Sequence, residues 1–135
     1  MANTFKIKTN AAMPATAGTP LTLYTCPGST STVVLGLLLC NIDTSQRTVD
    51  VKIEADTNDT ESNETVFLVK DAPVPAGGTL ELLSGNKVVL QATDVLKIDA
   101  DVASKIDATL SIMEITKYGI HWYITSRNFW YWSKR

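Results

Sequence analysis

Apolar and polar residues alternate along much of this chain with the period of two that places successive side chains on opposite faces of a β-strand. In residues 47–56 the positions of one face are apolar, namely Val49, Val51, Ile53 and Ala55. The positions between them are charged, namely Asp50, Lys52, Glu54 and Asp56. In residues 106–116 the same alternation places Ile106, Ala108, Leu110 and Ile112 inside and Asp107, Thr109 and Ser111 outside. Such strands are typical of sheets that are packed on one face and wet on the other.

Short segments rich in Val, Ile, Leu and Thr recur at intervals of about 8–12 residues, separated by turn residues, and helical periodicity is absent. The predicted strands are 5–8, 21–25, 32–42, 47–56, 65–72, 78–84, 87–91, 95–99 and 106–116. About eight or nine short strands without a helix predict an all-β fold, a single antiparallel β-sandwich of jelly-roll or immunoglobulin-like topology.

The segment 32–42 differs from the other strands because it is apolar on both faces. Two explanations are open. Either this strand is central in its sheet, or one of its faces is covered by a neighbouring chain.

Turn residues organise the rest of the chain. Residues 73–78, Pro-Val-Pro-Ala-Gly-Gly, predict a corner at which the chain crosses between sheets, and Ser84-Gly85-Asn86 predicts the turn of a hairpin. Residues 9–20 are small and polar with two prolines, which predicts an extended arm or a linker between the first strand and the body. We therefore expect an N-terminal strand and extended arm over 1–20, the β-sandwich over 21–116, and an aromatic, basic C-terminal tail over 117–135.

Charge is unevenly distributed along the chain. Residues 1–116 carry eight Lys or Arg and fourteen Asp or Glu, a net charge of −6. Residues 117–135 carry Lys117, Arg127, Lys134 and Arg135 and no acid, a net charge of +4. The overall charge of −2 favours neither nucleic acid nor a membrane as partner.

The N-terminal residues and the two cysteines bear on whether the protein is secreted. Residues 1–8 lack the apolar region of a signal peptide, so we expect a protein made and used without secretion. Without export, Cys26 and Cys40 are expected to be free, buried thiols rather than a disulfide.

A search for catalytic or ligand-binding residues identifies no constellation. His121 is the one histidine and has no Asp, Glu, Cys or second His close to it in sequence. The acidic loop 56–64 departs from a calcium-binding loop at Glu61, where Gly is required, and at Phe67, where Glu is required. Neither of the glycine-rich phosphate-binding motifs, G-x-G-x-x-G and G-x-x-x-x-G-K-S/T, is present. We expect no catalytic residue, no cofactor and no metal.

The tail 117–135 is the most distinctive segment, because it holds seven of the ten aromatic residues and all three tryptophans. Aromatic side chains dominate the energetics of interfaces, so this segment needs cover. The predicted interface residues are Tyr118, Trp122, Tyr123, Arg127, Phe129, Trp130, Tyr131, Trp132, Lys134 and Arg135. Three roles are open: packing on its own sandwich, anchoring to another subunit or partner, and stacking of Trp122, Tyr123, Trp130 and Trp132 on sugar rings.

The order of several segments carries a resemblance to a known family. The segments are Thr-Pro-Leu-Thr-Leu-Tyr-Thr-Cys-Pro (19–27), Thr-Val-Val-Leu-Gly-Leu-Leu-Leu-Cys-Asn (32–41), Val-Phe-Leu-Val-Lys-Asp-Ala-Pro-Val-Pro-Ala-Gly-Gly (66–78), Gly-Asn-Lys-Val-Val-Leu-Gln-Ala-Thr-Asp-Val-Leu-Lys-Ile (85–98) and Leu-Ser-Ile-Met-Glu-Ile-Thr (110–116). In this order they resemble small virion structural proteins of tailed bacteriophages, including those of marine and cyanobacterial phages. The resemblance implies a β-sandwich present in many copies on a head, neck or tail, without catalytic residues. The aromatic tail departs from that family.

Two hypotheses from different classes follow. The first is a non-enzymatic virion subunit, a capsid decoration (cement) protein or a neck or tail accessory protein, assembled in the host cytoplasm. Its partners would be the major capsid protein or a neck or tail protein and copies of itself, with no nucleic acid and no membrane. The alternative is a carbohydrate-binding β-sandwich module for host recognition.

Overall fold

The computed structural model describes residues 2–55 and 61–116, and the backbone of 121–124 and 130–133. All regular elements in these ranges are β-strands. In chain order they are β1 (Ala2–Met13), β2 (Leu21–Thr25), β3 (Thr30–Asn41), β4 (Arg47–Glu54), β5 (Val66–Val74), β6 (Thr79–Leu82), β7 (Val88–Leu90), β8 (Val95–Ala100), β9 (Ile106–Thr116), β10 (His121–Ile124) and β11 (Trp130–Ser133).

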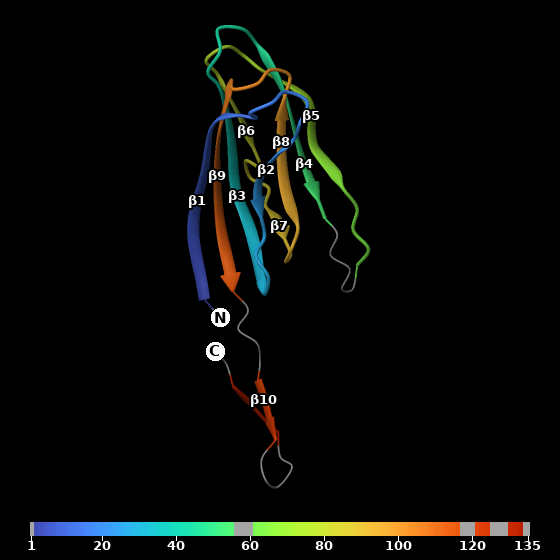
Figure 1. Ribbon diagram of the computed structural model, residues 1–135. Helices are drawn as coiled ribbons and strands as arrows, with labels where there is room; N and C mark the ends of the chain where they lie inside the picture. The colour runs from blue at the N-terminus through green and yellow to red at the C-terminus, as the bar shows by residue number, and fades with distance from the viewer. Residues whose placement is uncertain (1, 56–60, 117–120, 125–129, 134–135) are drawn as a thin grey trace.

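Nine of these strands form two antiparallel sheets that face each other (Figure 1). Sheet A has the order β1-β9-β3-β6, with β7 also paired to β3, and sheet B has the order β2-β8-β4-β5. Taken in order, β1, β9, β3 and β6 of sheet A correspond to β2, β8, β4 and β5 of sheet B, and each such pair is consecutive in sequence. This is the strand order of a jelly roll. The predicted all-β, single-sandwich fold is confirmed, and the strand order selects the jelly roll over the immunoglobulin-like alternative.

The core lies between the two sheets and is built by the alternation predicted from the sequence. In β4 the inward residues Val49, Val51 and Ile53 are buried, and in β9 every second residue from Ile106 to Ile112 is buried. The other core residues are Met13, Leu23, Cys26, Val34, Leu37, Leu39, Val74, Leu90, Leu96, Ile98 and Ala100. The residues between them point outward, so the outer face of each sheet is a separate surface.

The doubly apolar strand is central. β3 lies between β9 on one side and β6 and β7 on the other, which is the first of the two explanations given for its composition. Its inner residue Leu37 is 0% exposed, whereas the next residue, Leu38, points outward and is 41% exposed. Packing between the two sheets therefore accounts for the apolar inner face of β3, and its apolar outer face remains partly exposed to water.

The predicted hairpin at Ser84-Gly85-Asn86 is wrong. β6 and β7 both pair antiparallel with β3, through Leu37 opposite Leu82 and Val34 opposite Val88, so the chain continues in one direction along the edge of sheet A. The residues between the two strands leave the edge and rejoin it. Leu83 and Gly85 adopt φ values of 66° and 81°, the left-handed conformation that allows this detour.

The predicted extended arm over 9–20 is wrong in its first half. β1 continues to Met13, whose side chain is buried in the core, so residues 9–13 belong to sheet A. The loop that follows is bound to the sandwich, because Ser104 N donates to Pro14 O at 2.9 Å and Gly18 N donates to Asp99 at 3.2 Å. This loop carries the chain from sheet A to sheet B, and its small residues suit that crossing.

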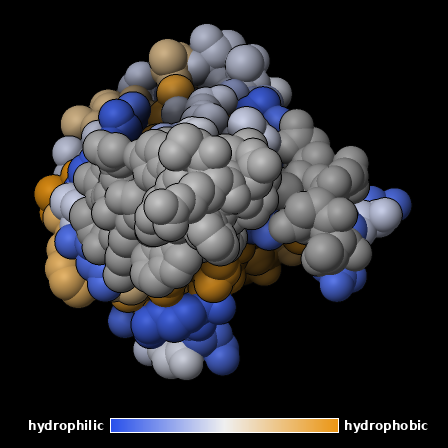
Figure 2. Space-filling model, turned by 90° about the horizontal axis from the view of Figure 1, so that it is seen from below, coloured by the Kyte–Doolittle hydropathy of each residue, from blue (hydrophilic) through white to orange (hydrophobic). Residues whose placement is uncertain are grey.

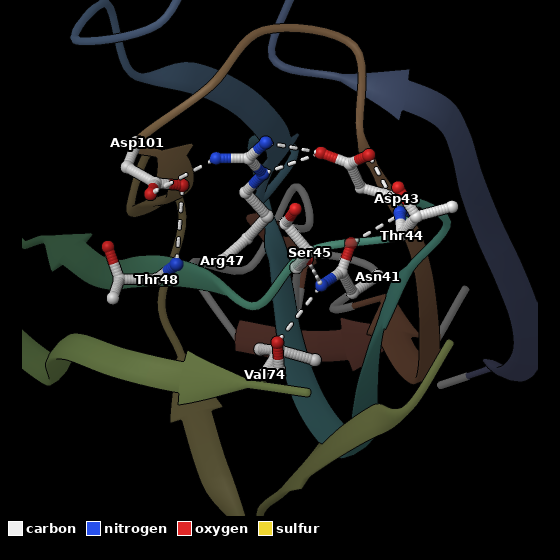
Figure 3. Close-up of polar contacts among 8 residues, drawn as sticks. All are labelled: Asn41, Asp43, Thr44, Ser45, Arg47, Thr48, Val74 and Asp101. Carbon is white, nitrogen blue, oxygen red and sulfur yellow. Dashed lines mark hydrogen bonds and ion pairs between the residues drawn. The ribbon is translucent and has the colours of Figure 1, made fainter. Parts of the chain in front are cut away.

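A polar network closes the end of the sandwich at which β3 turns into β4 (Figure 3). The Asn41 amide, fully buried, donates to Ser45 O at 2.8 Å and to Val74 O at 3.0 Å. Arg47 Nε donates to Asp43 at 2.7 Å, and the Arg47 guanidinium also faces Asp101 at 3.9 Å. The guanidinium and the Thr44 N–H lower the pKa of the Asp43 carboxyl. This end, named here the upper end, has its buried polar groups paired within the chain.

Candidate interaction surface

One row of apolar side chains crosses the outer face of sheet A near its lower end, the end at which β9 finishes. Phe5 of β1 lies opposite Met113 of β9, Met113 lies opposite Val33 of β3, and Val33 lies opposite Val89 of β7. Phe5 is 72% exposed and Val89 is 59% exposed. Four neighbouring strands thus present apolar side chains to the same face at the same height.

Further apolar residues widen this row. Ile7, the next outward residue of β1, is 68% exposed, and Ile115, the next outward residue of β9, is half-buried. The apolar patch is defined here as Phe5, Ile7, Val33, Val89, Met113 and Ile115. Toward the upper end the same face becomes mainly polar, with Thr9 opposite Thr109 and Leu38 opposite Glu81. A contiguous exposed apolar patch bordered by polar residues is typical of an interaction site.

A hollow of about 600 Å³ adjoins the patch at Val89. Apolar residues of sheet B line one part of it, namely Ile53, Ala55 and Val66. Acidic residues line another part, namely Glu61, Glu64 and Asp94. Figure 2 views this lower end from below, and hydrophobic surface gathers along its left margin, the side on which β1 lies in Figure 1. The apolar surface thus continues from the face of sheet A into an acidic hollow.

A polar network lies behind the patch, on the inner side of sheet A. Glu114, almost fully buried, faces the Lys6 ammonium at 2.7 Å and accepts a hydrogen bond from the Tyr24 hydroxyl at 2.5 Å. The Tyr24 and Thr32 hydroxyls are 2.8 Å apart. Lys6 and Tyr24 lower the pKa of Glu114, while burial and the Glu114 carboxylate raise the pKa of Tyr24. The phenol therefore stays protonated and its hydrogen bond to Glu114 links β2 to β9, while the Lys6–Glu114 ion pair links β9 to β1.

The cysteines are two free thiols. Cys26 is in the core, where its sulfur lies 3.3 Å from Thr30 O and 3.2 Å from the Thr32 hydroxyl. Burial raises the pKa of the Cys26 thiol, which disfavours the thiolate needed for nucleophilic chemistry or metal binding. Cys40 points outward from β3 and is half-buried rather than buried, unlike the prediction.

The outer face of sheet B is charged. Lys97 and Lys52 both contact Glu54, at 3.0 and 3.2 Å, and Lys70 contacts Asp50 at 3.0 Å. Burial alone would raise the pKa of Asp50, but the Asp71 N–H and the Lys70 ammonium together lower it below its usual value. The ion pairs on this face are therefore made within the chain.

A small hollow of about 60 Å³ on this face is lined by Pro20, Lys52, Phe67 and Lys97, among others. Pockets for small ligands have volumes of roughly 300–1,000 Å³, well above this value. The Lys70 ammonium lies 5.3 Å from the centre of the Phe67 ring and thus occupies one face of that ring. In the described ranges no group of three or more His, Cys, Asp or Glu has a geometry that could hold a metal ion.

Five of the predicted interface residues lie outside the described residues: Tyr118, Arg127, Phe129, Lys134 and Arg135. The other five lie in β10 and β11, where the structure describes the backbone: Trp122, Tyr123, Trp130, Tyr131 and Trp132. β10 and β11 form a two-stranded antiparallel sheet of their own, with Trp122 opposite Trp132 and Ile124 opposite Trp130. Backbone pairing therefore brings predicted interface residues from both strands together. Their role as an interface stays a prediction.

The apolar patch itself escaped the sequence reasoning. Two local signals could have found it. In β1, Phe5 and Ile7 alternate with Lys6 and Lys8, which marks one apolar face. In β9, the outward series runs Asp107, Thr109, Ser111 and then changes to Met113 and Ile115. Only the pairing of the strands shows that these two short apolar series lie side by side.

Comparisons with known proteins add no relative: no family model, no curated protein and no solved structure matches the chain. Within the ranges that the structure describes, there is no helix of the length and apolarity needed to cross a membrane. The function is therefore inferred from the surfaces of the chain itself.

Proposed function

We propose that this chain is a non-enzymatic structural subunit of a virion, a capsid decoration (cement) subunit or a neck or tail accessory subunit that bridges neighbouring subunits. The observation that carries the proposal is the apolar patch, because among the described residues three of the five large apolar side chains that are more than half exposed, Phe5, Ile7 and Val89, lie in it. An exposed apolar patch with a polar border is the arrangement expected of a surface that another polypeptide covers.

The fold and the resemblance support the same class. Jelly-roll sandwiches occur in viral capsid domains and also in lectins, so the fold by itself supports the class by analogy. The order of segments between 19 and 116 resembles small virion structural proteins of tailed bacteriophages. The networks around Glu114 and Arg47 leave no buried side-chain polar atom of the described residues without a hydrogen-bond partner, which suits a structural role.

The proposed mechanism is attachment through contact area. Stable protein–protein interfaces bury roughly 1,200–2,000 Å² in total, with aromatic and other apolar residues at their centre. In the proposed interface the apolar patch supplies the centre and the polar residues around it, such as Asn3, Thr9 and Thr109, supply the rim. The partners would be the major capsid protein or a neck or tail protein, and copies of this chain.

Sedimentation of the native protein tests this function. Lysates of cells that express the chain from its natural locus are separated on a density gradient, and fractions are probed with an antibody against the purified chain. The expected result is that the chain sediments with particles far heavier than its own 14.7 kDa, at a constant ratio to their main structural protein. Recovery of the chain in the light fractions alone would overturn the proposal.

A pair of matched variants localises the contact. Phe5→Lys with Val89→Lys adds two charges to the apolar patch, and Thr22→Lys with Thr25→Lys adds two charges to exposed positions of β2 in sheet B. All four positions are exposed, so both variants should fold. The patch variant should be lost from the particles and the β2 variant retained, because burying an unpaired charge in an apolar interface is costly. Equal retention of both variants would remove the apolar patch from the mechanism.

Carbohydrate binding is the second candidate, favoured by the presence of Phe67 among charged residues on the outer face of sheet B. It is less well supported, because the hollow there is small and Lys70 already covers one face of the Phe67 ring. All three tryptophans lie in 117–135, so tryptophan fluorescence in a saccharide titration reports on the aromatic segment, and calorimetry of the same titration also reports on the surface at Phe67. Saturable quenching or a saturable heat of binding would support this candidate over the structural subunit.

A further inference from the structure

We infer that the occupant of the apolar patch is the aromatic, basic C-terminal segment 117–135 of a neighbouring copy of this chain. The inference rests on the proposed function, because it takes the patch to be a contact between subunits. It adds the identity of one partner and the manner in which copies are joined.

The segment and the patch both need cover. A two-stranded ribbon such as β10–β11 is at best marginally stable alone in water, so it requires a surface to pack on. Its cross-strand pairs alternate between Trp122–Trp132 and Ile124–Trp130 on one side of the register and His121–Ser133 and Tyr123–Tyr131 on the other.

The dimensions of the two surfaces agree. The patch crosses β1, β9, β3 and β7, and three strand spacings amount to about 14 Å. Each strand of the ribbon has four residues, which span about 10 Å from the first Cα to the last. The ribbon can therefore cover most of the width of the patch.

The charges of the two surfaces are complementary. The segment 117–135 has a net charge of +4, whereas residues 1–116 have a net charge of −6. The hollow beside Val89 is lined by the exposed Glu61 and Glu64, so acidic side chains lie at the border of the apolar patch. Lys and Arg residues that flank the aromatic residues can meet these carboxylates, which gives the contact its orientation.

The face of sheet A is a better docking surface than its edge. β1 is an edge strand of twelve residues, and such edges can pair with another chain. However, Lys6 and Lys8 of β1 stand on the inner side of the sheet, opposite Ile112 and Leu110. Inward-pointing charges on an edge strand oppose edge-to-edge pairing. The occupant is therefore expected to pack on the outer face.

The position at which β9 ends favours a neighbouring copy as the source of the segment. Met113 and Ile115 of the patch lie just before Thr116, the last residue of β9, and β10 begins at His121. To cover its own patch the segment would have to reverse and pass to the outer face within the four intervening residues. A neighbour placed end to end requires no such reversal. Each copy then has one donor segment and one acceptor patch, a heterologous contact that joins copies in series.

A mixing experiment with full-length chains tests the inference. The acceptor variant is Phe5→Lys with Val89→Lys, and the donor variant is Trp122→Ser with Trp130→Ser and Trp132→Ser. Each variant alone should be monomeric by size exclusion with light scattering, with an association constant lowered about tenfold or more relative to the unmodified chain. A mixture of the two should form a one-to-one dimer and nothing larger, because one intact donor and one intact acceptor remain. A mixture that stays monomeric overturns the inference.

Fluorescence of the unmodified chain gives an independent test that needs no variant. All three tryptophans belong to the donor segment, so their emission reports its burial. The emission maximum should move to longer wavelength on dilution, as the copies separate. Emission independent of concentration would place the segment on its own chain and overturn the inference. If the native chain still sediments with heavy particles in that case, the proposed function stands and this inference alone fails.

Discussion

The outer faces of the two sheets differ sharply although the same alternation builds both. On sheet B the outward residues of β4 and β8 are mainly charged, and Asp50, Lys52, Glu54 and Lys97 form ion pairs with one another or with Lys70. On the lower half of sheet A the corresponding outward positions hold the apolar patch.

The two outer faces therefore differ in how well they tolerate exposure to water. Charged residues that pair with one another satisfy their interactions within the chain and tolerate water, so the outer face of sheet B is mainly polar, with Phe67 as an exposed apolar exception. Exposed Phe, Ile and Val side chains form no such pairs, and each leaves apolar area in water, which is unfavourable. The outer face of sheet A therefore leaves a row of apolar side chains exposed to water, whereas the outer face of sheet B is mainly charged.

Adjacent leucines of β3 test whether the outer apolar residues of sheet A serve the fold of their own chain. Leu37→Ala should lower the free energy of unfolding by about 2–5 kcal/mol, because its side chain is fully buried and its removal leaves a cavity. Leu38→Ala should cost less than about 1 kcal/mol, because that side chain is 41% exposed. Urea unfolding at low protein concentration measures both. Equal losses would show that the outer face packs on its own chain.

The network behind the patch should depend on pH. Lys6 and Tyr24 lower the pKa of Glu114 in the folded chain, so its carboxylate adds stability above its ordinary pKa of 4.5. That contribution is lost as the pH falls through the lowered value. Glu114→Gln should therefore cost about 1–2 kcal/mol at pH 7 and much less near pH 3.

Unfolding of the Glu114→Gln variant across this pH range provides the measurement. Glu81→Gln is the matched control, since Glu81 is an exposed glutamate on the outer face of the same sheet. A pH dependence that is the same in Glu114→Gln as in the unmodified chain would assign the effect to other carboxylates.

The smallest change is expected on the outer face of sheet B. Glu54→Gln removes the carboxylate that Lys97 and Lys52 share and that they hold at a lowered pKa. Because these pairs are open to solvent, the midpoint of unfolding should move slightly and the difference should shrink in concentrated salt. Self-association, measured by light scattering, should not change. If Glu54→Gln weakens association as strongly as the patch variant, the contrast between the two faces is wrong.

Local patterns in the sequence predicted much of the fold. The alternation in β4 and β9 and the position of β2 and β9 were correct, because a period of two and the turn residues that bound it are properties of neighbouring residues. The corner between 73 and 78 was also correct: β5 belongs to sheet B and β6 to sheet A, with Gly77 in a left-handed conformation between them. The errors at Ser84-Gly85-Asn86 and at 9–13 both concern long-range pairing. A turn motif shows where the chain bends but not which strand it meets afterwards, and small, polar residues do not reveal that a segment pairs with β9.

By itself, therefore, the sequence determined that this chain is an all-β sandwich with one charged strand face and an aromatic, basic end. The jelly-roll order and the apolar patch were decided by tertiary structure. Phe5, Val33, Val89 and Met113 are far apart in sequence, and each alone is an ordinary apolar residue in a strand. Long-range pairing of β1, β9, β3 and β7 brings them into one row, because register depends on partners that local sequence does not specify.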